Sequence, residues 1–396
     1  MRVRIYSEPR SGAIGGSEVS AAVLAAGLAA EHDVELVHNN RVLTRESLAT
    51  FAAVDLAGVT VKRLPLARGY KGPFWKVVSR YRAEQSEDAT LTGDCDVFIA
   101  FVHEPPPFCA AKRGILWILF PFHPLNDPNP AKRLWYKWKL QARLRGYQTR
   151  LAISGFAQKW TLARWNSASD ILFPPVQLDA VEFSEKTNRI LSVGRFATDG
   201  HGKKQIEMLG AYSRVRQAAA GSWSYHCLGG CGSSAAELAF FEEARCCGRE
   251  AGATVTANVT RDELRAAYAA SKIFWHAAGL GIDEDVEPER TEHFGISTVE
   301  AMAAGCVPVV INKGGQREIV EHEVSGFLWD TLDELQQYTL QLMEDEDLRR
   351  RMSSAARERA QKFGRDEFVR QFISRLPAST SAAETRNAGP CAASAT

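Results

Sequence analysis

The sequence predicts an α/β protein of two domains, each built on a parallel β-sheet with helices on both faces. With 396 residues, the chain is long enough for two domains with separate cores. Short apolar runs alternate with helix-like segments, which is typical of successive β-α-β units. This alternation pauses at Phe173–Val176 and resumes at Ile190, so we place a domain boundary near residue 180.

The first predicted domain, residues 1–180, contains six apolar runs with the length and composition of strands. A helix is expected after Ser17, because Val19, Val23 and several Ala and Leu residues recur there at helical spacing. The expected strands are Val3–Tyr6, Val34–His38, Val59–Leu64, Val97–Val102, Ile115–Phe120 and Leu151–Ile153.

The second predicted domain, residues 181–360, repeats the pattern. Its expected strands are Ile190–Val193, Ser224–Leu228, Ala253–Thr256, Ile273–His276 and Val307–Ile311, and its helices include Arg261–Ala270 and Ile296–Ala304. The helical pattern continues to residue 376, and we expect residues 361–376 to form a C-terminal helix that packs back on the first domain. Residues 377–396 are small and polar, and this composition predicts a disordered tail.

The overall composition favours a soluble protein with no global attraction to nucleic acid. The net charge is +1, with 45% apolar and 24% charged residues. The eight cysteines show no CxxC pair and no Cys/His zinc spacing, so reduced cytoplasmic thiols are expected. No run approaches the roughly 18 apolar residues that a membrane span requires, and no signal peptide is recognisable. We therefore expect a cytoplasmic protein, either soluble or peripheral on the cytoplasmic face of a membrane.

The strongest chemical signal is the segment Glu292–Glu300, EHFGISTVE, which precedes AMAAG and the apolar run VPVVI. It predicts a glycine-containing loop that leads into a helix ending at Gly305. The backbone N–H groups of Phe294, Gly295 and Ile296 would lie at the helix start, at the positive end of its dipole. Such a site suits a phosphate group.

The two glutamates of this segment are eight residues apart, which is about 12 Å along a helix. Carboxylate pairs of glycoside hydrolases are separated by roughly 5–9.5 Å. Glu292 and Glu300 are therefore better placed to hold two ends of one long ligand than to attack one bond. Taken alone, the segment is equally consistent with an amphipathic helix that exposes two glutamates.

The E-x7-E spacing, the HFG core and the following AMAAG-x-PVV together resemble the donor site of retaining family 4 glycosyltransferases. The resemblance extends over most of the chain, through GAIGGSE (12–18), ILSVGRF and GHGKKQ (190–205), NKGGQREIV (312–320) and VSGFLWD (324–330). It implies GT-B architecture, in which two Rossmann-like domains face a deep cleft. The first domain would bind the acceptor and the second a nucleotide-sugar donor.

The resemblance also implies the residues of catalysis. Arg195 and either Lys203 or Lys204 would neutralise the donor diphosphate, because a guanidinium fork and an ammonium suit a leaving group that gathers negative charge. The longer TDGHG interval leaves the choice of lysine open, and a solvated basic turn is the alternative. Glu292 would bind the donor sugar. His123, at the end of the predicted strand Ile115–Phe120, would contact the transferred sugar, unless it only caps nearby carbonyls.

Further residues would bind the rest of the donor. Gly15 and Gly16 would let the backbone of the first domain approach the diphosphate, since glycine has no side chain. The helix start at Phe294, Gly295 and Ile296 would supply N–H groups. Glu300 would bind the ribose hydroxyls, and Val259 would contact the base. His103, which ends the strand before that of His123, is a weaker candidate for the rim of the site.

No metal and no cofactor are expected. Two DXD-like strings occur, Asp94-Cys-Asp96 and Asp283-Glu-Asp285, and paired carboxylates can hold a divalent cation against a diphosphate. Turn formation and a solvated acidic loop explain these strings more simply. The cations proposed at the diphosphate already supply the charge that a metal would supply.

Two stretches, residues 62–82 and 132–150, each contain seven Lys or Arg and no acidic residue, with aromatic residues interspersed. Basic residues attract a protein to anionic lipid, and tryptophan side chains settle at the membrane interface. An anionic membrane surface and a lipid-linked acceptor are therefore one interpretation. The other is that the aromatic side chains pack inward while the charges face water. No nucleic-acid partner is expected, because neither stretch belongs to a recognised binding module.

These features predict a retaining, metal-independent transferase that moves a mannose- or glucose-type hexose to a glycan or lipid-linked acceptor. FPPV and the NSASD segment before it resemble mannosyltransferases of lipid-linked glycans and favour a GDP-linked donor, with a UDP-linked donor nearly equal. The alternatives are a GT-B sugar phosphorylase and a non-catalytic nucleotide-sugar-binding protein. A nicotinamide oxidoreductase is disfavoured, because the chain lacks the GxGxxG fingerprint.

Overall fold

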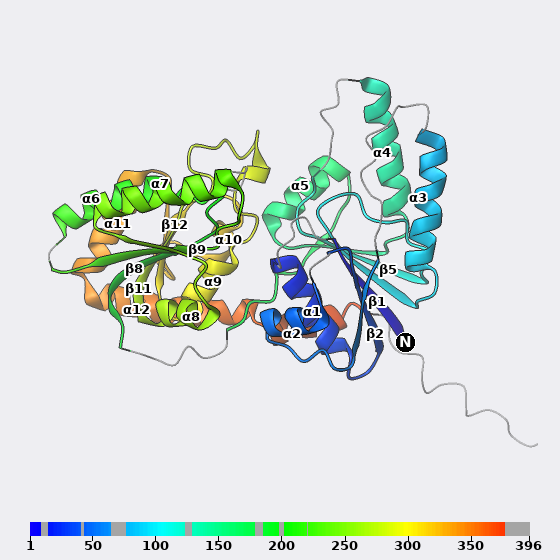
Figure 1. Ribbon diagram of the computed structural model, residues 1–396, viewed down its shortest axis with the longest axis horizontal. Helices are drawn as coiled ribbons and strands as arrows, with labels where there is room; N and C mark the ends of the chain where they lie inside the picture. The colour runs from blue at the N-terminus through cyan, green and yellow to red at the C-terminus, as the bar shows by residue number, and fades with distance from the viewer. Residues whose placement is uncertain are drawn as a thin grey trace, which may run out of the picture.

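Two parallel β-sheets form the framework of the computed structural model, with helices against both faces of each (Figure 1). The structure describes residues 1–8, 15–40, 43–64, 77–122, 129–178, 185–197, 202–219 and 221–376, and of residues 77–80 only the backbone. The prediction of two parallel-sheet domains is confirmed. The strand positions expected from the sequence agree with the observed ones to within three residues.

The first sheet has the strand order β3-β2-β1-β4-β5-β6-β7. Its strands are β1 (Arg2–Ser7), β2 (Asp33–His38), β3 (Val59–Arg63), β4 (Val97–Val102), β5 (Arg113–Ile118), β6 (Thr149–Ala152) and β7 (Asp170–Ile171). Every residue of β4 is buried, as expected for a central parallel strand covered on both faces. The strand β7 was not predicted, because its two residues are too short to produce a pattern.

The second sheet has the strand order β10-β9-β8-β11-β12-β13. Its strands are β8 (Thr187–Val193), β9 (Ser224–Gly229), β10 (Thr254–Ala257), β11 (Ser271–His276), β12 (Val307–Ile311) and β13 (Phe327–Trp329). The segment 324–330, interpreted from the sequence as a closing turn, contains a turn and then the short edge strand β13, which pairs with β12.

Helices lie between most successive strands. In the first domain they are α1 (Gly16–Leu28), α2 (Arg45–Ala52), α3 (Val77–Thr92), α4 (Pro130–Leu144) and α5 (Gly155–Trp165). The second domain contains α6 (Gln205–Ala218), α7 (Ala235–Ala251), α8 (Arg261–Ala270), α9 (Ile296–Ala303), α10 (Gln316–Ile319), α11 (Leu332–Glu344) and α12 (Glu346–Ala360). Within the described ranges, no helix combines the length and apolarity needed to cross a membrane.

The strand order reverses once in each sheet, between β1 and β4 and between β8 and β11. Ligands of open parallel sheets bind outside the carboxyl ends of the strands at such a reversal. The glycines at the start of α1 follow β1, Gly194 and Arg195 follow β8, and His276 is the last residue of β11. Topology alone therefore directs these residues to the two edges where ligands are expected.

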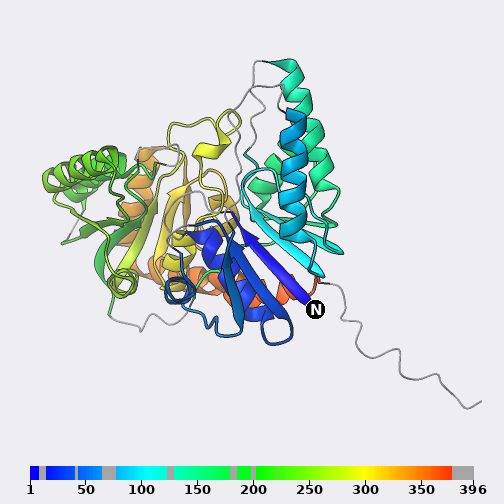
Figure 2. The same ribbon diagram turned by 45° about the vertical axis from the view of Figure 1, so that its right-hand side comes forward.

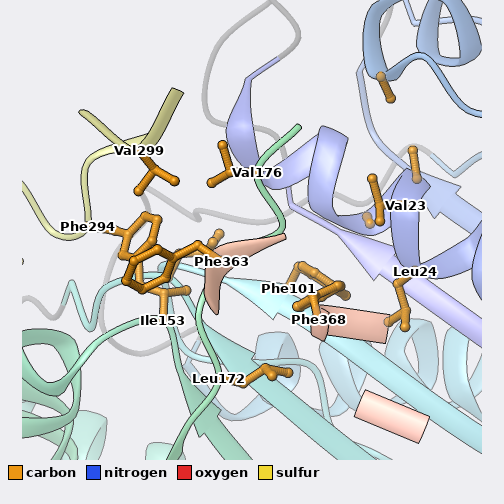
Figure 3. Packing of buried hydrophobic residues seen from close by; sticks show 14 of the residues in the cluster. Val23, Leu24, Phe101, Ile153, Leu172, Val176, Phe294, Val299, Phe363 and Phe368 are labelled. Carbon is orange, nitrogen blue, oxygen red and sulfur yellow. The ribbon is translucent and has the colours of Figure 1, made fainter. Parts of the chain in front are cut away.

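The C-terminal segment joins the two domains through apolar packing. After α12, the short 3₁₀ turn Gln361–Phe363 places the Phe363 ring 5.5 Å from that of Phe294, which precedes α9. Helix α13 (Arg365–Ile373) then lies against the first domain, where the rings of Phe368 and Trp117 are 5.6 Å apart. Figure 3 shows Phe363 beside Phe294 and Ile153, and Phe368 beside Phe101.

Polar contacts accompany this packing. The Arg365 guanidinium donates hydrogen bonds to the carbonyl oxygens of Ala52, at 2.6 Å, and Ala53, at 3.1 Å. A β-carbon on Gly27 of α1 would come within 2.6 Å of the Val369 side chain, so α13 approaches α1 as closely as a glycine permits. One apolar cluster consequently runs from the first sheet to α9, and it includes the C-terminal segment.

Replacing Phe368 tests how much stability the C-terminal segment contributes. Phe368 is 2% exposed, so Phe368→Ala should lower the free energy of unfolding by about 3–5 kcal/mol through lost burial and cavity formation. Denaturant unfolding followed by tryptophan fluorescence measures the change. Ile373→Ala, on the same helix but 43% exposed, is the matched control and should cost less than about 1 kcal/mol. Equal effects of the two substitutions would contradict the docking role of α13.

Candidate active site

Three segments of the second domain converge on the carboxylate of Glu292. The Lys203 ammonium, just before α6, donates to Glu292 Oε2 at 2.6 Å. The ring of His276, at the end of β11, places Nε2 3.0 Å from the same oxygen. Glu292 itself lies in the loop before α9. The side chains are 19%, 20% and 2% exposed for Glu292, Lys203 and His276, so the group is largely shielded from water.

The surroundings keep Glu292 ionised. Burial opposes ionisation of the carboxyl, but the charge of Lys203 and the hydrogen bond with His276 outweigh it and hold the pKa of Glu292 well below its usual range. Burial also lowers the pKa of His276, in spite of the neighbouring carboxylate, and the charge of Lys203 acts in the same direction. A neutral imidazole then donates Nε2–H to Glu292. Nδ1 of His276 has no hydrogen-bond partner within the described part of the chain.

Glycines fix the backbone on both sides of this group. The Gly315 N–H donates to the Glu292 carbonyl oxygen at 2.8 Å. Gly314 has a positive φ of 56°, and a β-carbon there would collide with the same carbonyl oxygen. On the other side, a β-carbon on Gly194 would lie 2.6 Å from Cγ of Lys203, so the glycine makes room for the lysine stem. The segments 190–205 and 312–320, which the sequence motifs singled out, thus hold Lys203 and Glu292 together.

The start of α9 faces the start of α1 across the two domains. Helix α9 begins at Ile296 after Gly295, whose φ of 123° is accessible mainly to glycine. A β-carbon on Gly16 would lie 2.9 Å from Cδ1 of Ile296. The first N–H groups of a helix have no intrahelical acceptor, so the start of α9 can bind an anion. The ring of Phe294 is instead buried, 3% exposed, so only its backbone is available to a ligand.

A hydrogen-bond acceptor within the chain already occupies polar groups at the start of α1. The Glu18 carboxylate accepts hydrogen bonds from the Gly15 N–H and the Ser17 hydroxyl, both at 2.9 Å. This is a capping arrangement of the kind that satisfies the free N–H groups of a helix start. Gly15 therefore donates its N–H to Glu18 in this structure. Residues 12–14 of the GAIGGSE motif lie outside the described residues.

The other two cationic candidates, Lys204 and Arg195, have different surroundings from those of Lys203. Lys204 has a positive φ of 60° and its ammonium pairs with Glu207 at 3.2 Å, so Lys203 and not Lys204 reaches Glu292. Arg195 is exposed in the turn after β8. The side-chain amide of Gln205 fixes this turn by donating to the carbonyl oxygens of Gly194, at 3.2 Å, and Arg195, at 2.9 Å.

The remaining candidates have surroundings of their own or lie outside the described residues. The Tyr268 hydroxyl donates to Glu300 at 3.0 Å, but burial outweighs this hydrogen bond and raises the pKa of Glu300. Val259 is half-buried just before α8. The ring of His103 is half-buried, 5.7 Å from the ring of Phe122. His123 lies outside the described residues.

Contacts between the domains hold the Glu292 loop against the first sheet. Ser154, just before α5, donates its hydroxyl to the His293 carbonyl oxygen at 2.6 Å. The His293 ring stacks on Phe120 with centroids 3.8 Å apart and planes 4° from parallel. The Glu318 carboxylate of α10 accepts from the N–H groups at the start of α5, Gly155 at 2.6 Å and Phe156 at 2.8 Å. An acidic side chain at a helix N-terminus is electrostatically favourable.

Sequence reasoning missed His276, Ser154 and Glu318. His276 carried a usable signal, because a polar residue that ends an apolar strand lies at the ligand edge of a parallel sheet. That same argument had selected His103 and His123. Ser154 and Glu318 carried no signal in the sequence, because their hydrogen-bond partners in the other domain lie 139 and 162–163 residues away in the chain.

The DXD-like strings are engaged in ion pairs and turns. Asp285 pairs with Lys159 at 2.8 Å, and Asp283 accepts from the N–H of Asp285 at 3.0 Å. Asp94 pairs with Arg4 at 2.6 Å, and Asp96 with Lys112 at 2.7 Å. Across the ranges that the structure describes, no three His, Cys, Asp or Glu side chains gather in a way that could hold a metal ion.

Comparisons with known proteins add an independent finding. Residues 176–359 match the protein family described as "Glycosyl transferases group 1". A stretch of 83 residues is 40% identical to a GDP-Man:Man(3)GlcNAc(2)-PP-Dol alpha-1,2-mannosyltransferase of Dictyostelium discoideum. That stretch covers 21% of this chain and 16% of the Dictyostelium protein.

The chain is also similar to solved structures along nearly its full length. A glycosyltransferase from Rickettsia africae superposes with a TM-score of 0.69 at 13% identity, over 94% of this chain and 97% of that one. HepE from Anabaena, solved with UDP and glucose, gives a TM-score of 0.65 at 15% identity over 94% and 98%. These similarities confirm the predicted GT-B fold. The family match covers residues 176–359, which include the whole second sheet.

The ionised state of Glu292 predicts a pH dependence of stability. Because the pKa of Glu292 is lower in the folded chain than the unfolded value of about 4.3, ionisation stabilises the fold fully above that value. This stability is lost as pH falls through the folded pKa. We expect Glu292→Gln to reduce the loss of thermal stability on acidification below about pH 4.5. Thermal midpoints measured against pH test this.

The control for that experiment is Glu358→Gln, which removes an exposed carboxylate on α12. It should follow the wild-type pH curve. A curve for Glu292→Gln that coincides with the wild type would show that Glu292 is not held ionised by its neighbours.

Proposed function

We propose that the protein is a retaining, metal-independent hexosyltransferase. It would move a mannose- or glucose-type sugar from a GDP- or UDP-linked donor to a glycan or lipid-linked acceptor. One observation carries this proposal. The ion pair between Lys203 and Glu292 lies at the end of the loop that leads into α9, in a chain with a GT-B fold and a glycosyltransferase group 1 domain.

The diphosphate of the donor would bind at the start of α9. The Lys203 ammonium has three N–H donors, of which one goes to Glu292, and another would bind a phosphate oxygen of the donor. The free N–H groups of α9 and the positive end of its dipole would stabilise the charge that develops on the departing nucleoside diphosphate. Arg195, exposed in the neighbouring turn, offers a bidentate fork for the same group.

Glu292 would position the sugar. As a carboxylate it only accepts hydrogen bonds, so it can bind hydroxyl groups of the donor sugar. Its hydrogen bonds with Lys203 and His276 stabilise its negative charge and make it a weak nucleophile. Glu300, on α9 and eight residues further along the chain, would bind the ribose at the other end of the donor.

The acceptor hydroxyl would attack from the face that the leaving group occupies. A nucleophile and a leaving group on one face give retention at the anomeric carbon without a covalent intermediate. The weak nucleophilicity of Glu292 supports this route over a covalent one. The N–H groups of α9, Lys203 and Arg195 would hold the diphosphate in place through the transition state. Closure of the two domains would exclude water and so limit hydrolysis of the donor.

The identity of the donor rests on two kinds of similarity. The 83-residue match to a mannosyltransferase named for a GDP-mannose donor and the FPPV segment favour GDP-mannose. The structural similarity to HepE, solved with UDP and glucose, favours a UDP-linked hexose. Thermal shifts measured with GDP and UDP separate the two, because a ligand that binds the folded chain raises its apparent stability.

Substitution at the proposed donor site tests the reaction itself. Glu292→Ala and Arg195→Ala should each lower transfer from the preferred nucleotide sugar by about 100-fold or more, since each removes an interaction that is strongest in the transition state. Arg351→Ala, at an exposed arginine on α12, is the control and should keep wild-type activity. Full activity in either site variant would refute the donor-site assignment.

NMR of the product should show retained anomeric configuration, and EDTA should leave the rate unchanged.

A pair of glycine substitutions tests whether the Glu292 backbone must be held in place. Gly314→Ala and Gly281→Ala both put a side chain at a positive φ, 56° and 74°, and both should destabilise the fold by about 1–2 kcal/mol. A β-carbon at Gly314 would displace Glu292, whereas one at Gly281 would meet no atom within 4 Å. We expect only Gly314→Ala to lower kcat/KM, by at least about tenfold. Equal activity of the two variants would contradict the positioning role of this turn.

A further inference from the structure

Helix α4 exposes a face that combines basic and apolar side chains. Residues 133 and 137 are four apart, as are 134 and 138, and 134 and 137 are three apart, so the four residues share one side of the helix. Leu134 is 71% exposed and Trp138 is 51% exposed. Arg133 and Lys137 are exposed between them. We call these four residues the α4 face.

The structure separates the two interpretations of the 132–150 stretch. Its second half packs inward: Tyr147 is buried and donates to the Pro107 carbonyl oxygen at 2.9 Å. Arg143 is 7% exposed and donates to Glu84 of α3 at 2.8 Å, and Lys139 pairs with the same glutamate. In the first half, Arg133, Leu134, Lys137 and Trp138 are instead exposed.

Most of the 62–82 stretch lies outside the described residues. Lys62 forms an ion pair with the buried Glu35, and Arg82 is exposed on α3. The described part of this stretch therefore adds one exposed cation, on the neighbouring helix α3.

Aromatic rings of α3 and α4 pack against Trp138 of the α4 face. The rings of Trp135 and Trp138 stack with centroids 5.1 Å apart, and Tyr81 of α3 lies 5.6 Å and 5.4 Å from them. This packing holds the tryptophan that is half outside the protein. The α4 face therefore presents a tryptophan held by its neighbours next to an exposed leucine, and both would be buried by an interface.

The α4 face lies at the edge where the proposed acceptor would enter. Helix α4 connects β5 to β6, so its first residues lie at the carboxyl edge of the first sheet. Figures 1 and 2 show α3 and α4 side by side, extending beyond the rest of the first domain. With 15 residues, α4 is about 22 Å long, which is enough to carry its start clear of the sheet.

We propose that the α4 face docks on the headgroup region of an anionic bilayer. Leu134 and Trp138 would enter the interface, where tryptophan is favoured, while Arg133 and Lys137 contact anionic headgroups. No acidic residue occurs on α4, which matches a negatively charged surface. A second copy of the chain fits worse, because a symmetric contact through α4 would bring two basic helices together with no acidic residue on either to pair with the cations. The surface is separate from the proposed donor site and does not require the transfer reaction.

Vesicle binding tests the proposal without donor or turnover. The full chain is sedimented with phosphatidylcholine vesicles and with vesicles that also contain phosphatidylglycerol. We expect binding to the anionic vesicles only, and weaker binding at high salt because screening shortens the reach of the charges. Arg133→Gln with Lys137→Gln should lower the partition coefficient about 30-fold, which corresponds to about 1 kcal/mol for each basic residue near an anionic surface. Leu134→Ser should lower it several-fold.

Matched variants control for charge and for exposed apolar area. Arg351→Gln with Lys362→Gln removes two exposed cations on other elements, and Leu238→Ser removes a leucine that is 48% exposed on α7. Both should bind anionic vesicles like the wild type. The proposal is overturned if the wild type ignores anionic vesicles, or if the control variants lose binding to the same extent. It is also overturned if light scattering shows a dimer that Leu134→Ser dissociates, because a second copy would then cover the face.

Discussion

The candidate site depends on the ion pair between Lys203 and Glu292. A carboxylate shielded from water is costly unless cations and hydrogen bonds compensate for lost solvation, and here Lys203 and His276 do so. The pair also ties together three segments that are distant in the chain: the loop after β8, the end of β11 and the loop before α9. The ion pair and the hydrogen bond with His276 therefore position the Glu292 carboxylate. The strand order of the second sheet in turn brings Lys203 and His276, which follow or end the adjacent strands β8 and β11, to the same edge.

Contacts between the two domains position Glu292, Lys203 and His276 relative to the first domain. Glu318 satisfies the start of α5, His293 stacks on Phe120, and Phe363 and Phe368 of the C-terminal segment pack on either side of the domain junction. These contacts bring the start of α9 against Gly16 of α1. The carboxyl edges of both sheets thus meet where a long, negatively charged ligand would be held from both sides.

The sequence predicted what depends on local pattern. Buried parallel strands are continuous apolar runs, so most strands and the fold class followed from periodicity, and short edge strands such as β7 and β13 did not. The motif around Glu292 indicated the helix start of α9 because glycine and the following periodicity mark it directly. Which of the two lysines pairs with Glu292 was not predictable, since it depends on the left-handed backbone of Lys204, whose ammonium pairs with Glu207. The contacts of Ser154 and Glu318 arise only when the two domains meet.

A crystal structure with GDP or UDP bound tests the central claim most directly. The account predicts diphosphate oxygens within hydrogen-bond distance, about 2.7–3.2 Å, of the N–H groups at the start of α9 and of Lys203 or Arg195. A nucleotide bound elsewhere, with the Lys203–Glu292 pair remote from both phosphates, would contradict it.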